Sequence, residues 1–148
     1  MKSEELKLPD AITHVLDECR MVLPGIQALF GFQMVAVFNS DFKKLTRNLQ
    51  ELHILAIVLV VISIALLMAP ASLHRQAEPR SVSDRFLNVA SRLLLAAMFP
   101  LSVSLCIDLY LVAHVVWQDP PIAILISATL FFVFAILWLI YPRVYRRR

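Results

Sequence analysis

The sequence predicts an all-α fold, a four-helix transmembrane bundle with an amphipathic N-terminal extension of the first helix, and three observations support this. Of the 148 residues, 59% are hydrophobic and only 17% are charged. The mean hydropathy is +0.74, well above the range of soluble domains. Four long stretches with few or no charges are separated by polar or proline-containing segments. We therefore expect residues 1–148 to form a single integral membrane domain.

The first helix combines an amphipathic segment with a membrane span. Apolar and polar residues alternate at helical spacing over 8–23. Residues 21–38 carry no charge, and at 1.5 Å per residue they extend about 27 Å, just enough to cross the hydrocarbon core. Pro24 lies inside this combined helix without an N–H for the carbonyl of Arg20, and Gly25 follows it. We expect a kink at this point.

Three further spans follow along the chain. The polar segment 39–51 has apolar residues at helical spacing and is expected to lie on the membrane surface. Residues 52–69 form the second span, which Pro70 is expected to stop or bend. Residues 93–117 form the third span. After a tight turn containing two prolines, residues 121–141 form the fourth.

The distribution of Lys and Arg predicts the orientation. With four spans both termini lie on one side of the membrane, and that side holds 11 of the 14 basic residues. These are Lys2, Lys7, Arg20, Arg75, Arg80, Arg85, Arg92, Arg143, Arg146, Arg147 and Arg148. By the positive-inside rule, we expect cytoplasmic N- and C-termini.

Motifs in three segments carry a resemblance to a known family. The first is Glu18-x-Arg20-x-x-x-x-Gly25-x-Gln27-x-Leu29-Phe30-x-Phe32 followed by Phe38-x-x-x-Phe42, the second is Ala69-Pro-Ala-x-x-His74-Arg75, and the third is Asp108. Over roughly residues 15–140 the chain resembles a family of small four-helix bacterial membrane proteins of unknown function. The resemblance implies four spans in the bacterial cytoplasmic (inner) membrane. Some members are labelled sodium:proton antiporters, although a four-span chain of this length does not resemble the known antiporter folds. Pro24 departs from the family pattern, which has a small or polar residue there, and this leaves the local helix geometry open.

Asp108 is the strongest candidate for chemistry inside the membrane. It lies nine residues before Trp117, about 13 to 14 Å along a helix, and therefore near the middle of the bilayer. A carboxylate at that depth normally faces protein or a water-filled cavity. Ser104 shares its helical face and is expected to donate a hydrogen bond to it. Asp108 is then either a proton or cation site, or a helix-packing carboxyl bonded to a glutamine of the first span.

Polar and small residues form a narrow stripe on the first span. The stripe consists of Arg20, Pro24, Gln27 and Gly31. Small residues and amides are typical of helix–helix interfaces in lipid, so we expect Pro24, Gly25 and Gly31 to serve helix packing and the stripe to form the seam of the bundle. A pore lining or a ligand-binding amide at Gln27 is the alternative. Gln33 points away from the stripe, toward another neighbour.

A second group of candidates lies at the cytoplasmic boundary, where the topology brings Glu18, Arg20, His74, Arg75 and Arg92 to a similar depth. Pairing of Glu18 with an arginine would offset the cost of burying each charge, and His74 would respond to pH near neutrality. The alternative is that the arginines extend their charged ends to the lipid headgroups.

The remaining patterns are mostly negative. Because no nucleophile with a base and no glycine-rich phosphate loop is present, we expect neither an enzyme nor a cofactor. Cys19 and Cys106 have no metal-ligand spacing, so no metal site is expected. The topology accounts for the basic segments, so we do not expect the protein to bind a nucleic acid. His53 and His114 are expected to be interfacial.

Two functions remain after these exclusions. The first is a structural or accessory membrane protein that forms homo-oligomers in the lipid bilayer. The alternative is a proton- or cation-conducting channel or transporter that uses Asp108. An unidentified membrane or cytosolic protein that binds the arginine-rich face is a third possibility for a partner.

Overall fold

The computed structural model describes residues 8–77 and 83–146, in which all regular structure is helical. The elements are α1 (Leu8–Phe38), the short 3₁₀ helix η1 (Phe42–Lys44), α2 (Arg47–Ala77), α3 (Asp84–Trp117), α4 (Pro120–Phe134), the π-helical segment η2 (Ala135–Ile140) and α5 (Tyr141–Arg146). Four helical stretches are long and apolar enough to cross a membrane, namely Asp10–Phe38, Arg47–Gln76, Asp84–Trp117 and Pro120–Tyr145. The predicted all-α, four-helix fold is confirmed.

The helices are longer than the apolar spans of the sequence. α1 runs without interruption through Pro24, so the amphipathic segment and the first span form one helix. Pro70 does not stop α2, which continues to Ala77, and α3 begins at Asp84, nine residues before the apolar stretch. Hydropathy detects only the length of a helix that lies in the hydrocarbon core, whereas these helices continue into the interfacial layer.

The connection between α1 and α2 also differs from the expected surface helix. It contains η1, and α2 begins directly after it. The Gln50 side chain reaches back from α2, and its Nε2 donates to the carbonyl oxygens of Phe42 and Leu45, both at 3.1 Å. The Phe42 carbonyl also accepts from the Leu45 N–H at 3.1 Å, so Gln50 adds a side-chain hydrogen bond to each of two carbonyls in this turn.

The predicted tight turn between α3 and α4 is present. Gln118 ends α3 in the left-handed conformation, with φ of 53°. Asp119 then caps α4 by accepting from the Ile122 N–H at 3.5 Å. Pro120 follows at the first helical position, where its missing N–H costs no hydrogen bond.

Residues buried between α1, α2 and α3 recur at the spacing of a coiled coil. In α1 they are Ile12, Cys19, Ile26 and Gln33; in α2 they are His53, Ala56, Val60, Ser63, Leu67 and Pro70; in α3 they include Ala90, Ala97, Ser104 and Leu111. A seven-residue recurrence keeps one face of each helix against its neighbours. Many of these residues are small, which permits close approach of helices in lipid.

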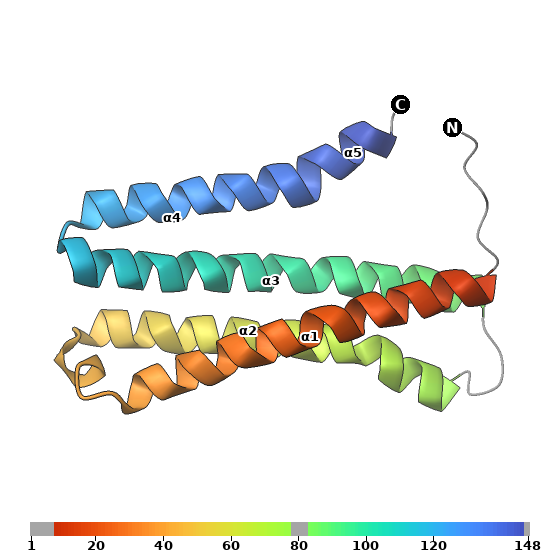
Figure 1. Cartoon of the computed structure of the whole chain (residues 1–148), viewed down its shortest axis with the longest axis horizontal. Helices are drawn as coiled ribbons and strands as arrows, with labels where there is room; N and C mark the ends of the chain where they lie inside the picture. Colours follow the sequence, from red (N-terminus) through yellow and green to blue (C-terminus); the bar gives the residue numbers. More distant parts are fainter. Residues whose placement is uncertain (1–7, 78–82, 147–148) are drawn as a thin grey trace.

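The fourth span occupies the edge of the bundle. Figure 1 shows α3 in the middle, with α1 and α2 on one side and α4 on the other. α4 is held to α3 by the fully buried Ala123 and by Ser127, whose Oγ donates to the Cys106 carbonyl at 2.8 Å. The core of the bundle therefore consists of α1, α2 and α3, and α4 packs against the outside of α3.

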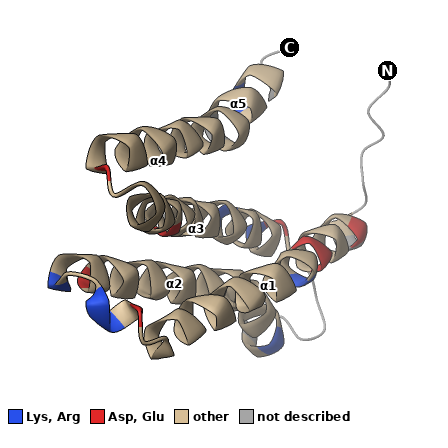
Figure 2. Cartoon of the chain, turned by 60° about the vertical axis from the view of Figure 1, so that its left-hand side comes forward, with Lys and Arg blue, Asp and Glu red and all other residues tan. Residues whose placement is uncertain are grey.

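The start of α1 and the end of α5 lie at the same end of the molecule (Figure 1). Basic residues of α3 and α5 also lie toward this end in Figure 2. Of the basic residues assigned to this side by the sequence, Lys2, Lys7, Arg80, Arg147 and Arg148 lie outside the described residues.

Candidate functional site

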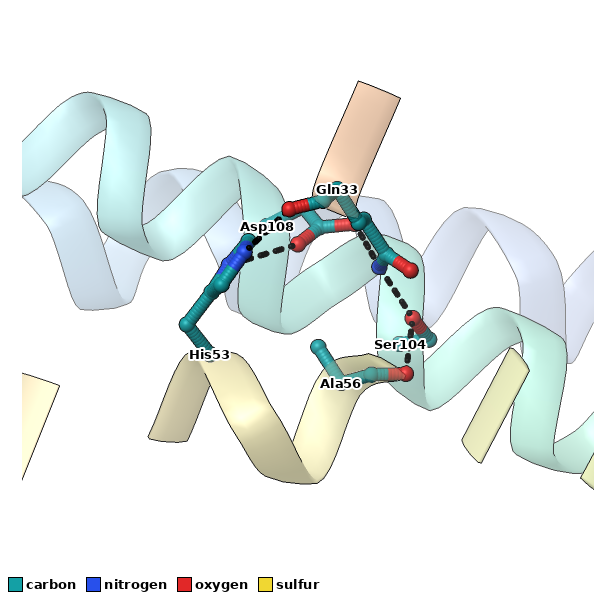
Figure 3. A network of polar contacts seen from close by, with 5 residues as sticks. All are labelled: Gln33, His53, Ala56, Ser104 and Asp108. Atoms are coloured by element: carbon teal, nitrogen blue, oxygen red, sulfur yellow. Dashed lines mark hydrogen bonds and ion pairs between the residues drawn. The ribbon is translucent and has the colours of Figure 1, made fainter. Parts of the chain in front are cut away.

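A cluster of polar side chains lies between the three core helices (Figure 3). Gln33 comes from α1, His53 from α2, and Ser104 and Asp108 from α3. Gln33 is only 4% exposed, His53 and Ser104 are also buried, and the Asp108 side chain retains 21% exposure. From the nearest helix ends the members of the cluster lie about 8 Å (Gln33) to 20 Å (Ser104) along their helices. The cluster therefore lies within the apolar part of the spans, on the side of the α1–α2 connection.

The amide of Gln33 is the centre of this cluster. Its Nε2 donates to Asp108 Oδ2 at 2.7 Å and to Ser104 Oγ at 3.1 Å. Ser104 Oγ in turn donates to the backbone carbonyl of Ala56 at 2.9 Å. Because Ala56 is fully buried and small, α3 approaches α2 closely enough for this bond. One amide and one hydroxyl thus link all three helices.

His53 completes the cluster and restricts where a proton resides. Its Nε2 lies 3.0 Å from the backbone oxygen of Gln33, and because a carbonyl only accepts, Nε2 carries a hydrogen. Nδ1 faces Asp108 Oδ1 at 3.8 Å. Two lone pairs facing each other would repel, so this pair is attractive only when the imidazole or the carboxyl holds a further proton. At 3.8 Å the two atoms face each other beyond hydrogen-bond distance, so His53 and Asp108 are close without a hydrogen bond between them.

The cluster also has more acceptors than donors. Gln33 Oε1 is buried without a hydrogen-bond partner in the described part of the chain. Both oxygens of Asp108 accept as well when the carboxyl is ionised. Such an excess of acceptors suits a proton or a small cation better than an anion.

The structure brings three of the four predicted intramembrane residues together and separates the fourth. Gln33, Ser104 and Asp108 meet, whereas Gln27 lies on the exposed face of α1. The predicted bond from Ser104 to Asp108 is absent, because the hydroxyl donates to Ala56 instead. The glutamine bonded to Asp108 is Gln33, one of the two glutamines of the first span that the sequence left as candidates.

The predicted seam on α1 differs from the observed one. Pro24, Gly25, Gln27 and Gly31 are exposed, and a Cβ added at either glycine would have no neighbouring heavy atom within 4 Å. The face of α1 that contacts α2 and α3 contains Ile26 and Gln33 instead. The stripe of small and polar residues therefore faces away from the chain's own bundle.

Sequence reasoning missed His53, which was expected to be interfacial. It is buried, and its ring packs edge-on against Phe42 with centroids 5.4 Å apart. The signal was available in the sequence: His53 begins the heptad series that continues through Val60 and Leu67. His114 stacks on Tyr110 with centroids 5.8 Å apart, in the last turns of α3.

The residues expected at the cytoplasmic boundary share one end of the molecule without forming one site. Arg20 pairs with Asp17 at 3.4 Å, and both are exposed. Within 8–77 and 83–146, no ion pair joins Glu18 to an arginine. The His74 ring packs on the buried Phe86, with centroids 5.5 Å apart. Arg75 and Arg92 are exposed.

Cys19 and Cys106 are free and buried on different helices. In the described ranges, no group of three or more His, Cys, Asp or Glu side chains is arranged to hold a metal ion.

Comparison with known proteins gives one match. A family model described as "Family of unknown function (DUF6328)" matches residues 2–142. No curated protein and no solved structure matches the chain. The match covers nearly the whole chain and confirms the resemblance to an uncharacterised family, while its description gives no support to an antiporter label.

Proposed function

The chain belongs to the DUF6328 family of unknown function, and we propose that it is a small structural or accessory membrane protein that associates with itself. The observation that carries this proposal is the Gln33 amide, which bonds Asp108 at 2.7 Å and Ser104 at 3.1 Å. The intramembrane carboxyl is thereby engaged by side chains of its own chain. Its first role is to fix α1 and α3 against each other.

Rigidity of the three-helix core supports an accessory role. The core helices meet through small residues and a shared polar network, both of which specify one packing in lipid. Asp108 lines neither the groove at the α1–α2 connection nor the groove between α3 and the fourth span. The outer faces of α1 and α4 are left for contacts with lipid or protein.

Self-association is proposed through the exposed stripe of α1. The Gln27 amide faces outward in a membrane span, where lipid offers it no hydrogen-bond partner. Gly31 has open space around it and permits close approach of a second helix. A second copy of α1 satisfies both requirements, since its own Gln27 supplies a donor and an acceptor.

The proposed location is the bacterial cytoplasmic membrane, with both termini in the cytoplasm. The support is the distribution of charge, with 11 of the 14 basic residues assigned to the side of the termini.

Energy transfer between labelled copies in liposomes, measured over a range of protein-to-lipid ratios, tests self-association. Gly31→Leu and Gln27→Leu are expected to weaken it by about 1–2 kcal/mol each. Phe32→Leu is the matched control, because Phe32 is exposed on α1 but lies off the stripe. If both stripe variants associate as the control does, association through this face is ruled out.

The second candidate function is a proton- or cation-conducting protein. Its specific support is the His53–Asp108 pair, two titratable side chains with 3.8 Å between Nδ1 and Oδ1 inside the bundle. A groove of about 600 Å³ opens at the α1–α2 connection. It is lined by Phe42, Leu45, Arg47, Gln50, Glu51 and Ile54. Phe42 lines this groove, and its ring also contacts the His53 ring.

Flux in proteoliposomes distinguishes the two candidates. A conducting protein passes protons or monovalent cations, and Asp108→Asn abolishes the flux because the amide cannot exchange a proton at that position. Ser72→Ala, at an exposed position far along α2, serves as the control. Flux that is absent in the parent protein, or unchanged in Asp108→Asn, excludes conduction through this pair.

A further inference from the structure

A second concave feature lies between α3 and the later part of the fourth span, away from the polar cluster. It has a volume of about 400 Å³, which falls within the usual range of ligand pockets. Its walls include Leu95 and Phe99 from α3 and Phe131, Phe134 and Trp138 from the fourth span. Arg143 is the charged residue of the lining.

The groove exists because the fourth span contacts α3 closely at one end only. Near the α3–α4 turn, the fully buried Ala123 and the bond from Ser127 to Cys106 hold the two helices together. Toward α5 the span draws away from α3 (Figure 1). Large rings occupy this part, where Phe134 and Trp138 stack with centroids 4.6 Å apart.

The π-helical segment η2 aims Arg143 at the groove. In an unbroken α-helix, Arg143 would follow Phe131 by twelve residues and lie about 120° around the axis from it. Hydrogen bonds in η2 span five residues, as from the Tyr141 N–H to the Ile136 carbonyl, so this segment turns less per residue. The difference rotates Arg143 back toward the groove. Pro142, which has no N–H for the Trp138 carbonyl, favours the widened helix.

Further features place the mouth of the groove at the membrane surface. Arg92 is exposed and lies three residues before Leu95 and seven before Phe99, on the same face of α3. Basic residues of α3 and α5 therefore approach the same end (Figure 2). Tyr141 and Trp138 are an aromatic pair typical of the interfacial layer. The groove is thus apolar along its length and positively charged at its headgroup end.

We propose that this groove binds one anionic phospholipid from the leaflet on the side of the termini. The phosphate lies against Arg143, with Arg92 adding positive charge, and an acyl chain lies along the aromatic wall. Guanidinium groups match phosphate oxygens in geometry and charge. Basic pockets between transmembrane helices are suited to anionic headgroups.

A second copy of this chain fits the groove poorly. Its fourth span ends in the same basic segment, so docking two such spans would bring like charges together at Arg143. A soluble anion would satisfy the guanidinium groups but would leave the apolar wall uncovered. An amphiphile with a negative headgroup complements both parts.

Fluorescence quenching in vesicles tests the proposal. The chain has two tryptophans, and Trp117 lies at the opposite end of α3. Trp117→Phe therefore leaves Trp138, in the groove wall, as the reporter. The protein is reconstituted in phosphatidylcholine vesicles with roughly 20 mol% of phosphatidylglycerol, which makes the membrane mildly anionic. In one sample the phosphatidylglycerol carries bromine on its acyl chains, and in the other the phosphatidylcholine does. We expect the anionic lipid to associate at Trp138 about five-fold more strongly, the contribution of one guanidinium near the membrane surface.

Variants then assign the preference to the groove. Arg143→Gln is expected to remove most of it and Arg143→Lys to retain much of it, while Arg47→Gln, an exposed residue at the other end of the bundle, leaves it unchanged. Ala135→Phe fills the groove and is expected to reduce quenching by both lipids. Circular dichroism checks that each variant retains the parent's helicity.

Three results overturn the proposal. The first is quenching of Trp138 by the two lipids in proportion to their mole fractions in the parent, which means equal association, and the second is a preference that survives Arg143→Gln. The third is protection of Trp138 from both lipids together with cross-linking between fourth spans, which would make a second copy the occupant.

Discussion

Replacing Gln33 by leucine is predicted to destabilise the three-helix core, whereas the same change at Gln27 is not. Both residues are glutamines of α1, six positions apart, and they differ in their surroundings. Gln33 is buried and donates two hydrogen bonds to α3. Gln27 is exposed. The pair isolates the effect of the network from that of removing an amide from a membrane helix.

The magnitude follows from the two bonds that are lost. Hydrogen bonds between membrane helices contribute about 0.6 kcal/mol on average and up to about 1.7 kcal/mol. With donor–acceptor distances of 2.7 and 3.1 Å, Gln33→Leu is expected to lower the free energy of unfolding by about 1–3 kcal/mol. Leucine nearly fills the space of glutamine, so little of this loss comes from a cavity. Gln27→Leu is expected to change it by less than about 0.5 kcal/mol.

Reversible unfolding in mixed micelles, followed by circular dichroism at a protein concentration low enough to keep the chain monomeric, measures both values. Combining Gln33→Leu with Asp108→Leu in a double-mutant cycle isolates the direct interaction of the two side chains, which we expect to be about 0.6–1.7 kcal/mol. Equal destabilisation by Gln33→Leu and Gln27→Leu would refute the reasoning. So would a coupling energy near zero.

Further predictions concern the attachment of α4 and the start of α3. Ala123→Leu places a large side chain where no space exists and is expected to cost about 1–3 kcal/mol, measured by the same unfolding assay; a neutral effect would contradict the close contact of α4 with α3. Ser127→Ala removes the bond to the Cys106 carbonyl and should cost about 0.6 kcal/mol, with Ser127→Thr retaining most of the stability. Ser83 caps α3 by accepting from the Phe86 N–H at 3.2 Å. Ser83→Ala should therefore lower the free energy of unfolding by about 1 kcal/mol, while Ser83→Asp should not. Equal stability of the two variants would argue against the cap.

The helical fold was predictable because hydropathy reports directly on the cost of burying charge in lipid. Four apolar stretches and the turn at Asp119-Pro120 are properties of local sequence, and each corresponds to an element of the structure. The continuation of α2 through Pro70 was not predictable in the same way. In a bundle, neighbouring helices support a proline-containing helix that would end in isolation.

The inward face of α1 was harder to predict than its existence. In water, the apolar face of a helix is the buried one, but in lipid both the inside and the outside of a bundle are apolar. Polar residues then become the main guide, and α1 offers two glutamines on different faces. Gln33 is the buried one, at the end of the heptad series of Ile12, Cys19 and Ile26. That series, rather than the stripe through Gln27 and Gly31, distinguishes the two faces.

The Gln33–Asp108 bond has a consequence for the synthesis of the protein. The two residues are 75 positions apart, and a ribosome adds about 5–20 residues per second, so Asp108 emerges roughly 4–15 s after Gln33. During that interval α2 is completed and α3 is begun, while the Gln33 amide lacks its partners on α3. The last step in completing the network is therefore the arrival of α3, and a nascent chain halted before Ser104 lacks both side-chain acceptors of the Gln33 amide.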